Sequence, residues 1–389
     1  MNANAPIYLD YAATTPVDPA VAELMSACLT LDGNFANPAS RSHLFGWKAE
    51  EAVEIARSQV AALIGADSRE IVWTSGATEA SNIALKGYVE AQGLKHAHFI
   101  TSAIEHKSVL DCFAYLEGLG HRVSYVKPQA DGRVSIDAIK ALIEGDTALV
   151  SLMHVNNETG AINDIAELGQ YLREQGIAFH VDASQSLAKV PVKVADLNVD
   201  LMSMSAHKMY GPKGQGALYV RRCPEINISA QMHGGGHERG MRSGTLATHQ
   251  IAGMGKAAAL AEQLLDKEHV QLQGLREQVI KGIDALPGIR LNGSREHSVP
   301  GIVNLCFRGV DGEVLLLSLK ELALSSGSAC MSATMAPSYV LAAMGLNEAD
   351  ALSSIRFSFG RFTTAEEIQR ALAVIERVYS SLSPNATSN

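Results

Sequence analysis

Strand-like and helix-like segments alternate along the first two thirds of this chain, and this alternation most constrains its fold. The strand-like segments are short and largely apolar: EIVWTSG, AHFITS, RVSYV, TALVSLMHV, IAFHVDAS, VDLMSMSAHK and GALYVRR. Before and between them, stretches such as KAEEAVEIARSQVAALIG repeat apolar residues at helical spacing, and this one ends at Gly65, a favoured residue after a helix. Apolar strands separated by helices form mostly parallel sheets covered on both faces. We therefore predict an α/β fold with a mostly parallel seven-stranded sheet flanked by helices.

The alternation fades after about residue 262, and this change marks the predicted domain boundary. A helical stretch runs from Met254 to Gly288. Beyond it, short strands and helices mix, as in GIVNLCF, SIRFSFG and TAEEIQRALAVIERVYSSL. We predict a large domain of residues 20–262 and a smaller α+β domain formed by residues 1–19 and 263–389.

Composition narrows the class of function. The formal net charge is −9, from 32 Lys and Arg against 41 Asp and Glu, and no basic block stands out, so we expect no direct nucleic-acid binding. No apolar run approaches the roughly 20 residues of a membrane-spanning helix, and the first residues lack the basic and apolar regions of a secretory signal. The cysteines are few and scattered, without a CxxC pair, which argues against structural zinc and fits a reducing cytoplasm. They are Cys28, Cys112, Cys223, Cys306 and Cys330.

Polar residues gather directly after the predicted strands. TSGATE, EHKS, HVNNETG, VDASQ and SAHKMYGPKG each follow an apolar segment. Because ligands of open α/β sheets bind at the carboxyl ends of the strands, these segments form the candidate site.

Lys208 follows an apolar strand and precedes a Gly/Pro turn. A lysine shielded from water at such a place has a lowered pKa and a nucleophilic amine. The alternative is an ordinary surface lysine at a strand end. For Lys213, beyond the turn, that surface interpretation is preferred.

Asp182 ends a strand-like segment, where an unpaired buried carboxylate is costly and needs a cationic partner. The protonated pyridine of pyridoxal phosphate (PLP) is such a partner, and an Asp together with a lysine is what proteins supply to PLP. The alternative is a helix N-cap.

Two helix starts are further candidates. The segment TSGA precedes a helix over residues 78–91, whose predicted cap is Ser75 or Thr78, and free N–H groups at a helix start favour a phosphate. His106 opens the next helix, either as a structural residue or as a ring that stacks on a planar cofactor and carries a proton.

Two segments rich in small residues remain. In HGGGHERGMRSGT, His233 and His237 are four apart, but three glycines between them argue against a helical metal pair, and we expect a mobile or phosphate-contacting loop. In SSGSACMSA, Cys330 lacks the large apolar neighbours of a packing cysteine, so we expect an approachable thiol in a mobile loop.

Nine segments occur in the order expected of a cysteine desulfurase: YLDYAATTP, NPAS, TSGATE, EHKS, MHVNNETG, HVDASQS, SAHKMYGPKG, GGGHERGMRSGT and SSGSAC. From about Ile7 to about Leu382, the chain resembles the IscS/NifS group of PLP-dependent fold type I enzymes, which are aminotransferase class V-like. The resemblance implies that L-cysteine is converted to L-alanine and that the sulfur passes to an enzyme cysteine as a persulfide.

By motif position, the resemblance implies a role for each site residue. Lys208 would hold PLP as a Schiff base, His106 would stack on the ring and assist proton transfer, and Cys330 would accept the sulfur. Asn157 and Arg356 would bind the cofactor and the substrate carboxylate. The remaining implied cofactor contacts are Ala77, Thr78, Ser205 and His207 at the phosphate, Asp182 and Gln185 at the ring, and Thr245 at the phosphate of the neighbouring subunit of a homodimer. No metal is implied.

The sequence departs from the group at a few positions and leaves the sulfur's destination open. Ala36, Ala206 and Met331 stand where the group commonly has Gly, Gly and Thr, and none of these changes removes a reactive group. The group usually continues past SSL with a tail that helps to dock an iron–sulfur scaffold protein, whereas this sequence ends at SPNATSN, which puts docking by that route in doubt. The acceptor protein would serve iron–sulfur cluster assembly or other sulfur trafficking such as tRNA thiolation. The alternatives are a selenocysteine lyase and a desulfurase specialised for another pathway, such as DNA phosphorothioation. A non-enzymatic scaffold is disfavoured because the reactive residues are present.

Overall fold

The computed structural model describes residues 5–325 and 336–383, and its centre is the predicted seven-stranded sheet. The strand order is β2-β8-β7-β6-β5-β3-β4. The strands are β2 (Ile71–Thr74), β3 (His98–Ser102), β4 (Arg122–Val126), β5 (Thr147–Ser151), β6 (Ala178–Asp182), β7 (Leu201–Ser205) and β8 (Gly216–Val220). Neighbours from β4 to β7 pair in parallel, and β8 runs antiparallel to both β7 and β2. The prediction of a mostly parallel sheet is therefore confirmed.

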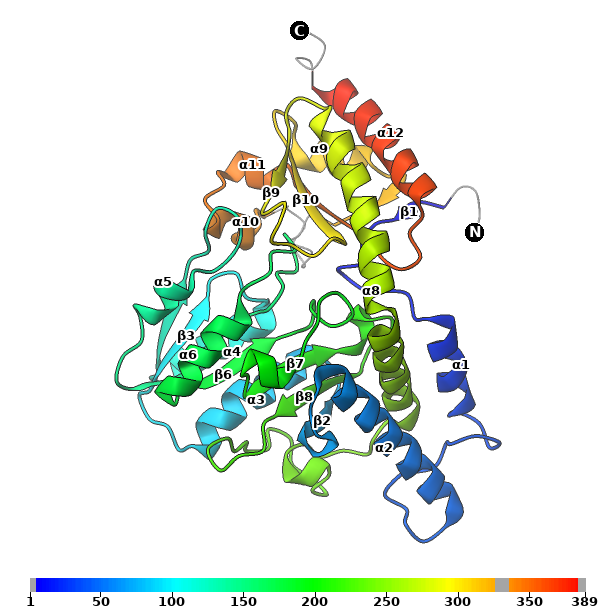
Figure 1. The fold of residues 1–389 in the computed structure, drawn as a ribbon, viewed down its shortest axis with the longest axis vertical. Helices are drawn as coiled ribbons and strands as arrows, with labels where there is room; N and C mark the ends of the chain where they lie inside the picture. Colours follow the sequence, from blue (N-terminus) through cyan, green and yellow to red (C-terminus); the bar gives the residue numbers. More distant parts are fainter. Residues whose placement is uncertain (1–4, 326–335, 384–389) are drawn as a thin grey trace.

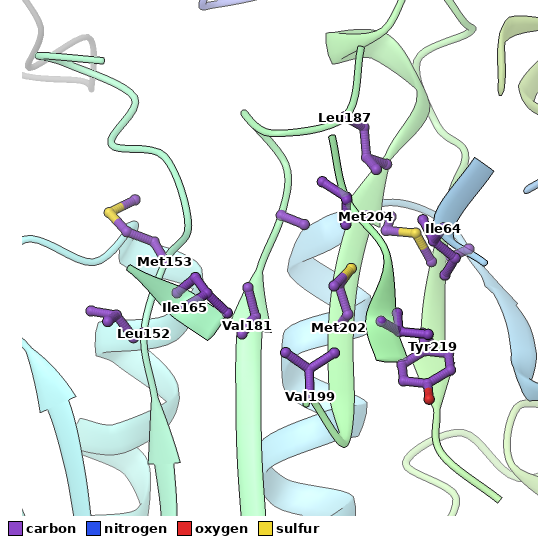
Figure 2. Packing of buried hydrophobic residues seen from close by; sticks show 14 of the residues in the cluster. Ile64, Leu152, Met153, Ile165, Val181, Leu187, Val199, Met202, Met204 and Tyr219 are labelled. Atoms are coloured by element: carbon purple, nitrogen blue, oxygen red, sulfur yellow. The ribbon is translucent and has the colours of Figure 1, made fainter. Parts of the chain in front are cut away.

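Helices cover both faces of this sheet because the strand side chains alternate between two apolar clusters. On β7, Met202 and Met204 face the cluster that includes α2 and α6, whereas Leu201 faces the cluster of α3 and α4. Figure 2 shows Met202 and Met204 packed with Val181 and Tyr219 on the first of these faces. The helices of this part are α1 (Pro19–Ala27), α2 (Leu44–Ile64), α3 (Ala77–Ala91), α4 (Lys107–Gly118), α5 (Ile136–Lys140), α6 (Ile165–Gln175) and α7 (Val194–Leu197).

Helix ends were predicted unevenly. As expected, α2 ends before Gly65, whose φ of 66° is the left-handed conformation that glycine adopts without strain. The predicted cap of α3 was wrong: the N-cap is Gly76, and no side chain caps this helix. The N–H of Ser75 instead donates to Glu79 Oε2 at 2.7 Å. This contact satisfies an N–H that precedes the helix, and the first N–H groups of α3 keep no side-chain cap.

A second, smaller apolar cluster lies on a three-stranded antiparallel sheet with the order β12-β10-β9. Its elements are β9 (Ile289–Asn292), β10 (Ile302–Phe307), β12 (Ser354–Ser358), α9 (Gly312–Ser318), α10 (Tyr339–Ala343), α11 (Glu348–Leu352) and α12 (Ala365–Leu382). The N-terminal β1 (Ile7–Tyr8) pairs in parallel with β11 (Leu322–Ala323) on this side of the molecule.

Helix α8 (Thr248–Asp284) connects the two parts, and Figure 1 shows it running from the large sheet to the smaller one. Its first half packs into the large cluster through residues such as Met254, and its second half packs into the small cluster through residues such as Val279. The predicted boundary at residues 262 and 263 falls within this helix, and the domain division stays a proposal. No helix in the described part of the chain has the length and apolar character needed to cross a membrane.

Candidate active site

The carboxyl ends of the parallel strands converge beside a segment from the N-terminus. Asp182 ends β6, and Lys208 ends the 3-10 turn Ala206–Lys208 that follows β7. Gln185 Nε2 and Lys208 Nζ both donate to the carbonyl of Ala12, at 2.8 and 2.5 Å. Residues far apart in the sequence are thereby held at one place.

The amine of Lys208 is held by the N-terminal segment and shielded from water. Its Nζ also donates to the carbonyl of Ala13 at 2.7 Å. Burial, followed by the positive charge of Arg356, lowers the pKa of the Lys208 amine to about 8, and Asp10 and Asp182 act in the opposite direction. A much larger fraction of this amine is neutral near pH 8 than of an ordinary lysine, and the neutral form is the nucleophile.

Asp182 is buried, with 4% of its surface exposed. Its Oδ1 accepts hydrogen bonds from the backbone N–H and the hydroxyl of Ser184, at 2.9 and 2.6 Å. The carboxylate therefore closes a turn rather than capping an α-helix. Two residues earlier on the same strand, burial lowers the pKa of His180 to about 4, so this neighbour is neutral near pH 7 and does not supply the cationic partner.

The predicted phosphate contacts lie on two adjoining turns. Ala77 and Thr78 open α3, whose first N–H groups have no partner inside the helix. Ser205 ends β7, and the glycine Gly216 opens β8 beside it. A Cβ on Gly216 would lie 2.6 Å from the Cα of Gly76, so only glycine at position 216 lets the two turns approach this closely.

His207 lies next to Lys208, and its Nδ1 is 3.1 Å from the hydroxyl oxygen of Thr14. Burial, followed by the charge of Lys208, lowers the pKa of His207 to about 4. The ring is therefore neutral at pH 7, and it can offer a hydrogen bond to a phosphate but no positive charge.

Arg356 on β12 contacts the chain after β5. Its side chain is 5% exposed, and its Nη1 donates to the carbonyl of Asn157 at 2.9 Å. Its Nη2 donates to Asp10 Oδ1, also at 2.9 Å. The structure thus brings the two predicted carboxylate-binding residues together and adds Asp10, to which the sequence had assigned no role.

Two further predicted residues have no described contact with this group. His106 is exposed, and its Nδ1 caps α4 by accepting the N–H of Ser108 at 3.2 Å, so the cap geometry leaves its Nε2 unused. Thr245 is exposed on the loop that follows the 3-10 turn Glu238–Gly240. No contact described in this structure joins either residue to Lys208.

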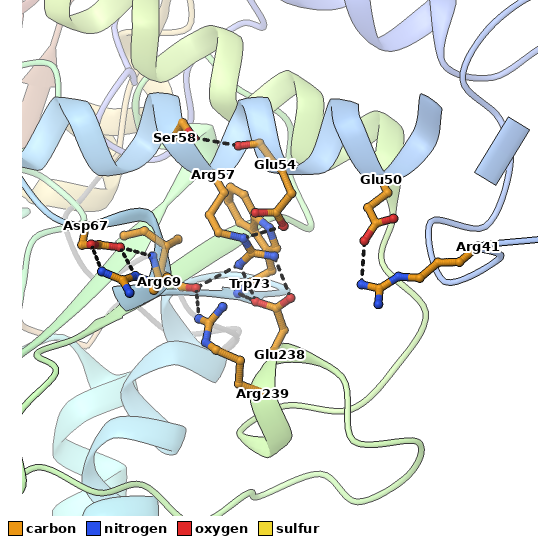
Figure 3. A network of polar contacts seen from close by, with 11 residues as sticks. Arg41, Glu50, Glu54, Arg57, Ser58, Asp67, Arg69, Trp73, Glu238 and Arg239 are labelled. Carbon is orange, nitrogen blue, oxygen red and sulfur yellow. Dashed lines mark hydrogen bonds and ion pairs between the residues drawn. The ribbon is translucent and has the colours of Figure 1, made fainter. Parts of the chain in front are cut away.

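The loop of Thr245 is fixed to the sheet by charged contacts, which Figure 3 shows in part. Glu238 accepts two hydrogen bonds from Arg57, at 2.7 and 2.9 Å, and the N–H of Trp73 on the end strand β2 at 2.8 Å. Further along, Arg242 Nε donates to Glu79 Oε1 at 2.7 Å. The loop is therefore held to both sides of the turn between β2 and α3, close to the predicted phosphate site.

Cys330, the predicted sulfur acceptor, and the predicted mobility of its loop lie outside the described residues. The nearest described position is Ser325, whose carbonyl accepts the N–H of Arg356 at 2.9 Å.

The polar groups of this site fit PLP. Three of the predicted site residues each have a buried polar atom without a hydrogen-bond partner in the described structure: Asn157 Oδ1, Gln185 Oε1 and Arg356 Nε. Buried polar atoms are costly without partners, so such a cluster is what a bound polar ligand would complete. The amine of Lys208, the buried carboxylate of Asp182 and the uncapped start of α3 supply the three further kinds of contact that PLP needs.

Sequence comparison gives the family of the chain. Residues 7–371 match the aminotransferase class-V family. Cysteine desulfurase IscS of Pseudomonas aeruginosa strain LESB58 is 58% identical over 377 residues, which cover 97% of this chain and 93% of that protein.

Solved structures agree with the sequence relatives. A NifS-like protein superposes with a TM-score of 0.90 at 34% identity, and the match covers 97% of this chain and 100% of the other. SspA in complex with cysteine superposes with a TM-score of 0.80 at 37% identity, covering 92% of this chain and 100% of the other. The chain therefore belongs to the aminotransferase class-V family and, within it, to the PLP-dependent cysteine desulfurases of the IscS/NifS group.

Proposed function

We propose that this cysteine desulfurase converts L-cysteine to L-alanine at the site around Lys208 and passes the sulfur to Cys330 as a persulfide. The observation that supports this best is the Lys208 amine. Its pKa is lowered to about 8, and the charge of the buried Asp182 acts on it. The relative solved with cysteine bound, SspA, supports L-cysteine as the substrate.

The cofactor would be held at three places. Lys208 Nζ would bind it covalently, Asp182 and Gln185 would contact the ring nitrogen and hydroxyl, and His106 would stack on the ring. The phosphate would lie against Ala77, Thr78, Ser205 and His207. When bound, PLP supplies an electron sink for the bond changes at the substrate Cα.

The protein groups would then bind the substrate and move protons. Arg356 and Asn157 would bind the substrate carboxylate, because a guanidinium presents a planar pair of donors to it. Lys208 Nζ would take the proton from the substrate Cα, with His106 assisting proton transfer. The Cys330 thiolate would attack the substrate sulfur, so that an S–S bond forms while the carbon–sulfur bond breaks. The electrons of the broken bond stay with the substrate carbon, which is protonated on the way to L-alanine.

The assembly around this site is also a proposal. The functional unit would be a homodimer in which Thr245 reaches the phosphate of the neighbouring subunit, and its exposure supports this. The large unit of residues 20–262 would carry the cofactor, and the smaller unit of residues 1–19 and 263–389 would carry the Cys330 loop. The proposed compartment is the cytoplasm, from the scattered cysteines. The proposed acceptors are an iron–sulfur scaffold or a sulfur carrier.

Two variants test the reaction. Lys208→Ala is expected to lose both L-alanine formation and the visible absorption of the bound cofactor. Cys330→Ser is expected to keep the absorption and to lose sulfide release in the presence of a thiol reductant. Lys213→Ala is the matched control, because it removes a neighbouring amine outside the site. Turnover that survives in Lys208→Ala, or full activity in Cys330→Ser, would contradict the assignment.

The destination of the sulfur needs a separate experiment. A persulfide-transfer assay would offer the cysteine-treated protein to an iron–sulfur scaffold and to sulfur carriers. Failure with the scaffold alone would favour a specialised desulfurase. Rates on L-cysteine and L-selenocysteine distinguish a desulfurase from a selenocysteine lyase, because both substrates would fit one site.

A further inference from the structure

The N-terminal segment Asp10–Thr14 is part of the site, although its partners lie about 170 to 350 positions away in the sequence. The carbonyl of Ala12 receives both Lys208 and Gln185, and that of Ala13 receives Lys208. The N–H of Ala12 donates to the Ser358 hydroxyl at 2.8 Å. The segment is thereby fixed between the large sheet and β12.

Asp10 is the residue of this segment whose side chain reaches the substrate-binding arginine. Its Oδ1 accepts Arg356 Nη2 at 2.9 Å, and its side chain is 21% exposed against 5% for Arg356. A charged pair of this kind is stronger than a neutral hydrogen bond and fixes the plane of the guanidinium.

The other N–H donors of Arg356 differ in whether they have a partner. Nη1 is taken by the carbonyl of Asn157, whereas Nε is buried and has no partner in the described structure. Nε–H and one N–H of Nη2 lie on the same edge of a guanidinium, and a carboxylate binds such an edge with two parallel hydrogen bonds. The contacts with Asn157 and Asp10 use one N–H of Nη1 and one N–H of Nη2, so Nε–H and a second N–H of Nη2 have no partner in the described structure and can serve a ligand.

We propose that Asp10 is a positioning residue for the substrate carboxylate: it holds Arg356 with its Nε edge directed at the substrate. This inference rests on the proposed function. It assigns a role to Asp10, the acidic residue of YLDYAATTP. It also explains why Arg356, a buried arginine proposed to bind an anionic substrate, is paired with a carboxylate when no substrate is bound. Without that pairing, the guanidinium would be a buried charge in the state without substrate, which is costly.

The charge of Asp10 has a second effect that can be measured separately. The charged and titratable groups around the Lys208 amine are Arg356, Asp10, Asp182, Lys189 and His207. The Asp10 carboxylate raises the pKa of this amine, against the lowering by burial and Arg356. Removing the carboxylate therefore lowers the pH at which the lysine nitrogen loses its proton.

The experiment compares Asp10→Ala with Asp10→Asn in the PLP-loaded full chain. Asn keeps an oxygen that can accept from Arg356 Nη2, whereas Ala removes the contact. In Asp10→Ala, we expect the KM for L-cysteine to rise about tenfold while kcat changes less than about threefold, as for the loss of one charge-assisted hydrogen bond. In Asp10→Asn, we expect the KM to stay within about threefold of the wild-type value. Should Asp10→Ala fail to fold, Asp10→Ser replaces it, because its hydroxyl is too short to reach Arg356.

Two readouts do not depend on desulfuration. L-Alanine carries the carboxylate but no sulfur, and its binding to the PLP-loaded protein is followed by the change in visible absorption. The L-alanine concentration at half-saturation should be highest in Asp10→Ala and close to the wild-type value in Asp10→Asn, as expected for the KM. The pH midpoint of the visible absorption should fall in both Asp10 variants, because both lack the negative charge.

Asp18→Ala is the matched control. Asp18 also pairs with a buried arginine, Arg361, at 2.6 Å, and it lies near the same end of the chain. An unchanged KM and an unchanged L-alanine half-saturation in Asp10→Ala would overturn the inference. Equal increases in Asp10→Ala and Asp18→Ala would also overturn it, because they would show only a loosened N-terminal segment. If the wild-type protein binds PLP but does not desulfurate L-cysteine, the proposed function fails, and the L-alanine titration still tests Asp10.

Discussion

Lys208 shows at the scale of a residue how the fold changes the chemistry of a common side chain. An exposed lysine amine is almost fully protonated at pH 8, with an ordinary pKa near 10.4. At this site, burial and then the charge of Arg356 lower the pKa to about 8. The carbonyls of Ala12 and Ala13 hold the amine near the carboxyl end of β7. Gln185, which follows β6, donates to the same carbonyl of Ala12.

This lowered pKa gives a prediction for the cofactor-free protein. Recombination with PLP needs the neutral amine, so its rate should rise with pH and reach half of its maximum near pH 8, the pKa of Lys208. The appearance of the cofactor's visible absorption after mixing, followed across a pH series, measures this rate. Lys213→Ala should show the same midpoint. A midpoint above about pH 10 would mean that Lys208 behaves as an ordinary exposed lysine.

At the scale of an element, strand β2 depends on the loop that follows β8. β2 is an end strand, and the N–H of Trp73 on its open edge would lack a partner within the sheet. The carboxylate of Glu238 supplies that partner. Arg57 neutralises this carboxylate, and both side chains are almost fully buried. Glu238 and Arg239 adopt left-handed φ values of 49° and 56°, which strain the backbone. The buried contacts of Glu238 with Arg57 and Trp73 offset the cost of this conformation.

The buried pair predicts a large effect on stability. Glu238→Gln leaves the buried Arg57 with the exposed Glu54 as its remaining carboxylate partner, at 3.0 Å, and should lower the free energy of unfolding by about 3 kcal/mol. Denaturant titration measures this change. The exposed pair of Arg41 and Glu50, drawn in the same view in Figure 3, is the control. Glu50→Gln should cost less than about 1 kcal/mol. Similar losses in the two variants would show that the Arg57–Glu238 pair has no special role.

At the scale of the whole molecule, the proposed site would take residues from both parts of one subunit and, in the proposed homodimer, from the second subunit. Arg356 comes from the small sheet, Lys208 from the large one, and Thr245 lies exposed on a loop braced by Arg242 and Glu79. A heterodimer tests whether Thr245 serves its own subunit or the neighbouring one.

In this experiment, one subunit carries Lys208→Ala and the other carries Thr245→Val. If Thr245 crosses to the neighbour, the site that keeps Lys208 also receives a normal Thr245 and should bind PLP with wild-type affinity. If Thr245 acts within its own subunit, that same site carries the Val, and its affinity should fall about tenfold, as for one lost hydrogen bond to a phosphate. The equilibrium binding of PLP, followed by its visible absorption, separates the two outcomes. A protein that light scattering finds monomeric would contradict the homodimer.

The sequence by itself determined the features that depend on neighbouring residues. The seven apolar strands and the end of α2 at Gly65 follow from local periodicity and backbone preference, and both were predicted. The residues after the strands were predicted as a site because parallel strands bring their carboxyl ends to one edge. The cap of α3 was missed because a hydroxyl residue was expected there, whereas the N-cap is Gly76, which has no side chain to cap with.

Only the tertiary structure decided which distant residues meet. Arg57 and Glu238 are 181 positions apart, and Asp10 and Arg356 are 346 positions apart, and no periodicity in the sequence relates their positions. The lowered pKa of Lys208 also depends on the tertiary structure. Its amine becomes buried, and the charge of Arg356 comes near it, only when the two parts of the chain pack together. The sequence thus supplied the reactive groups, and the packing of the chain set their ionisation and their partners, since desolvation and Coulomb interactions depend on distance in space.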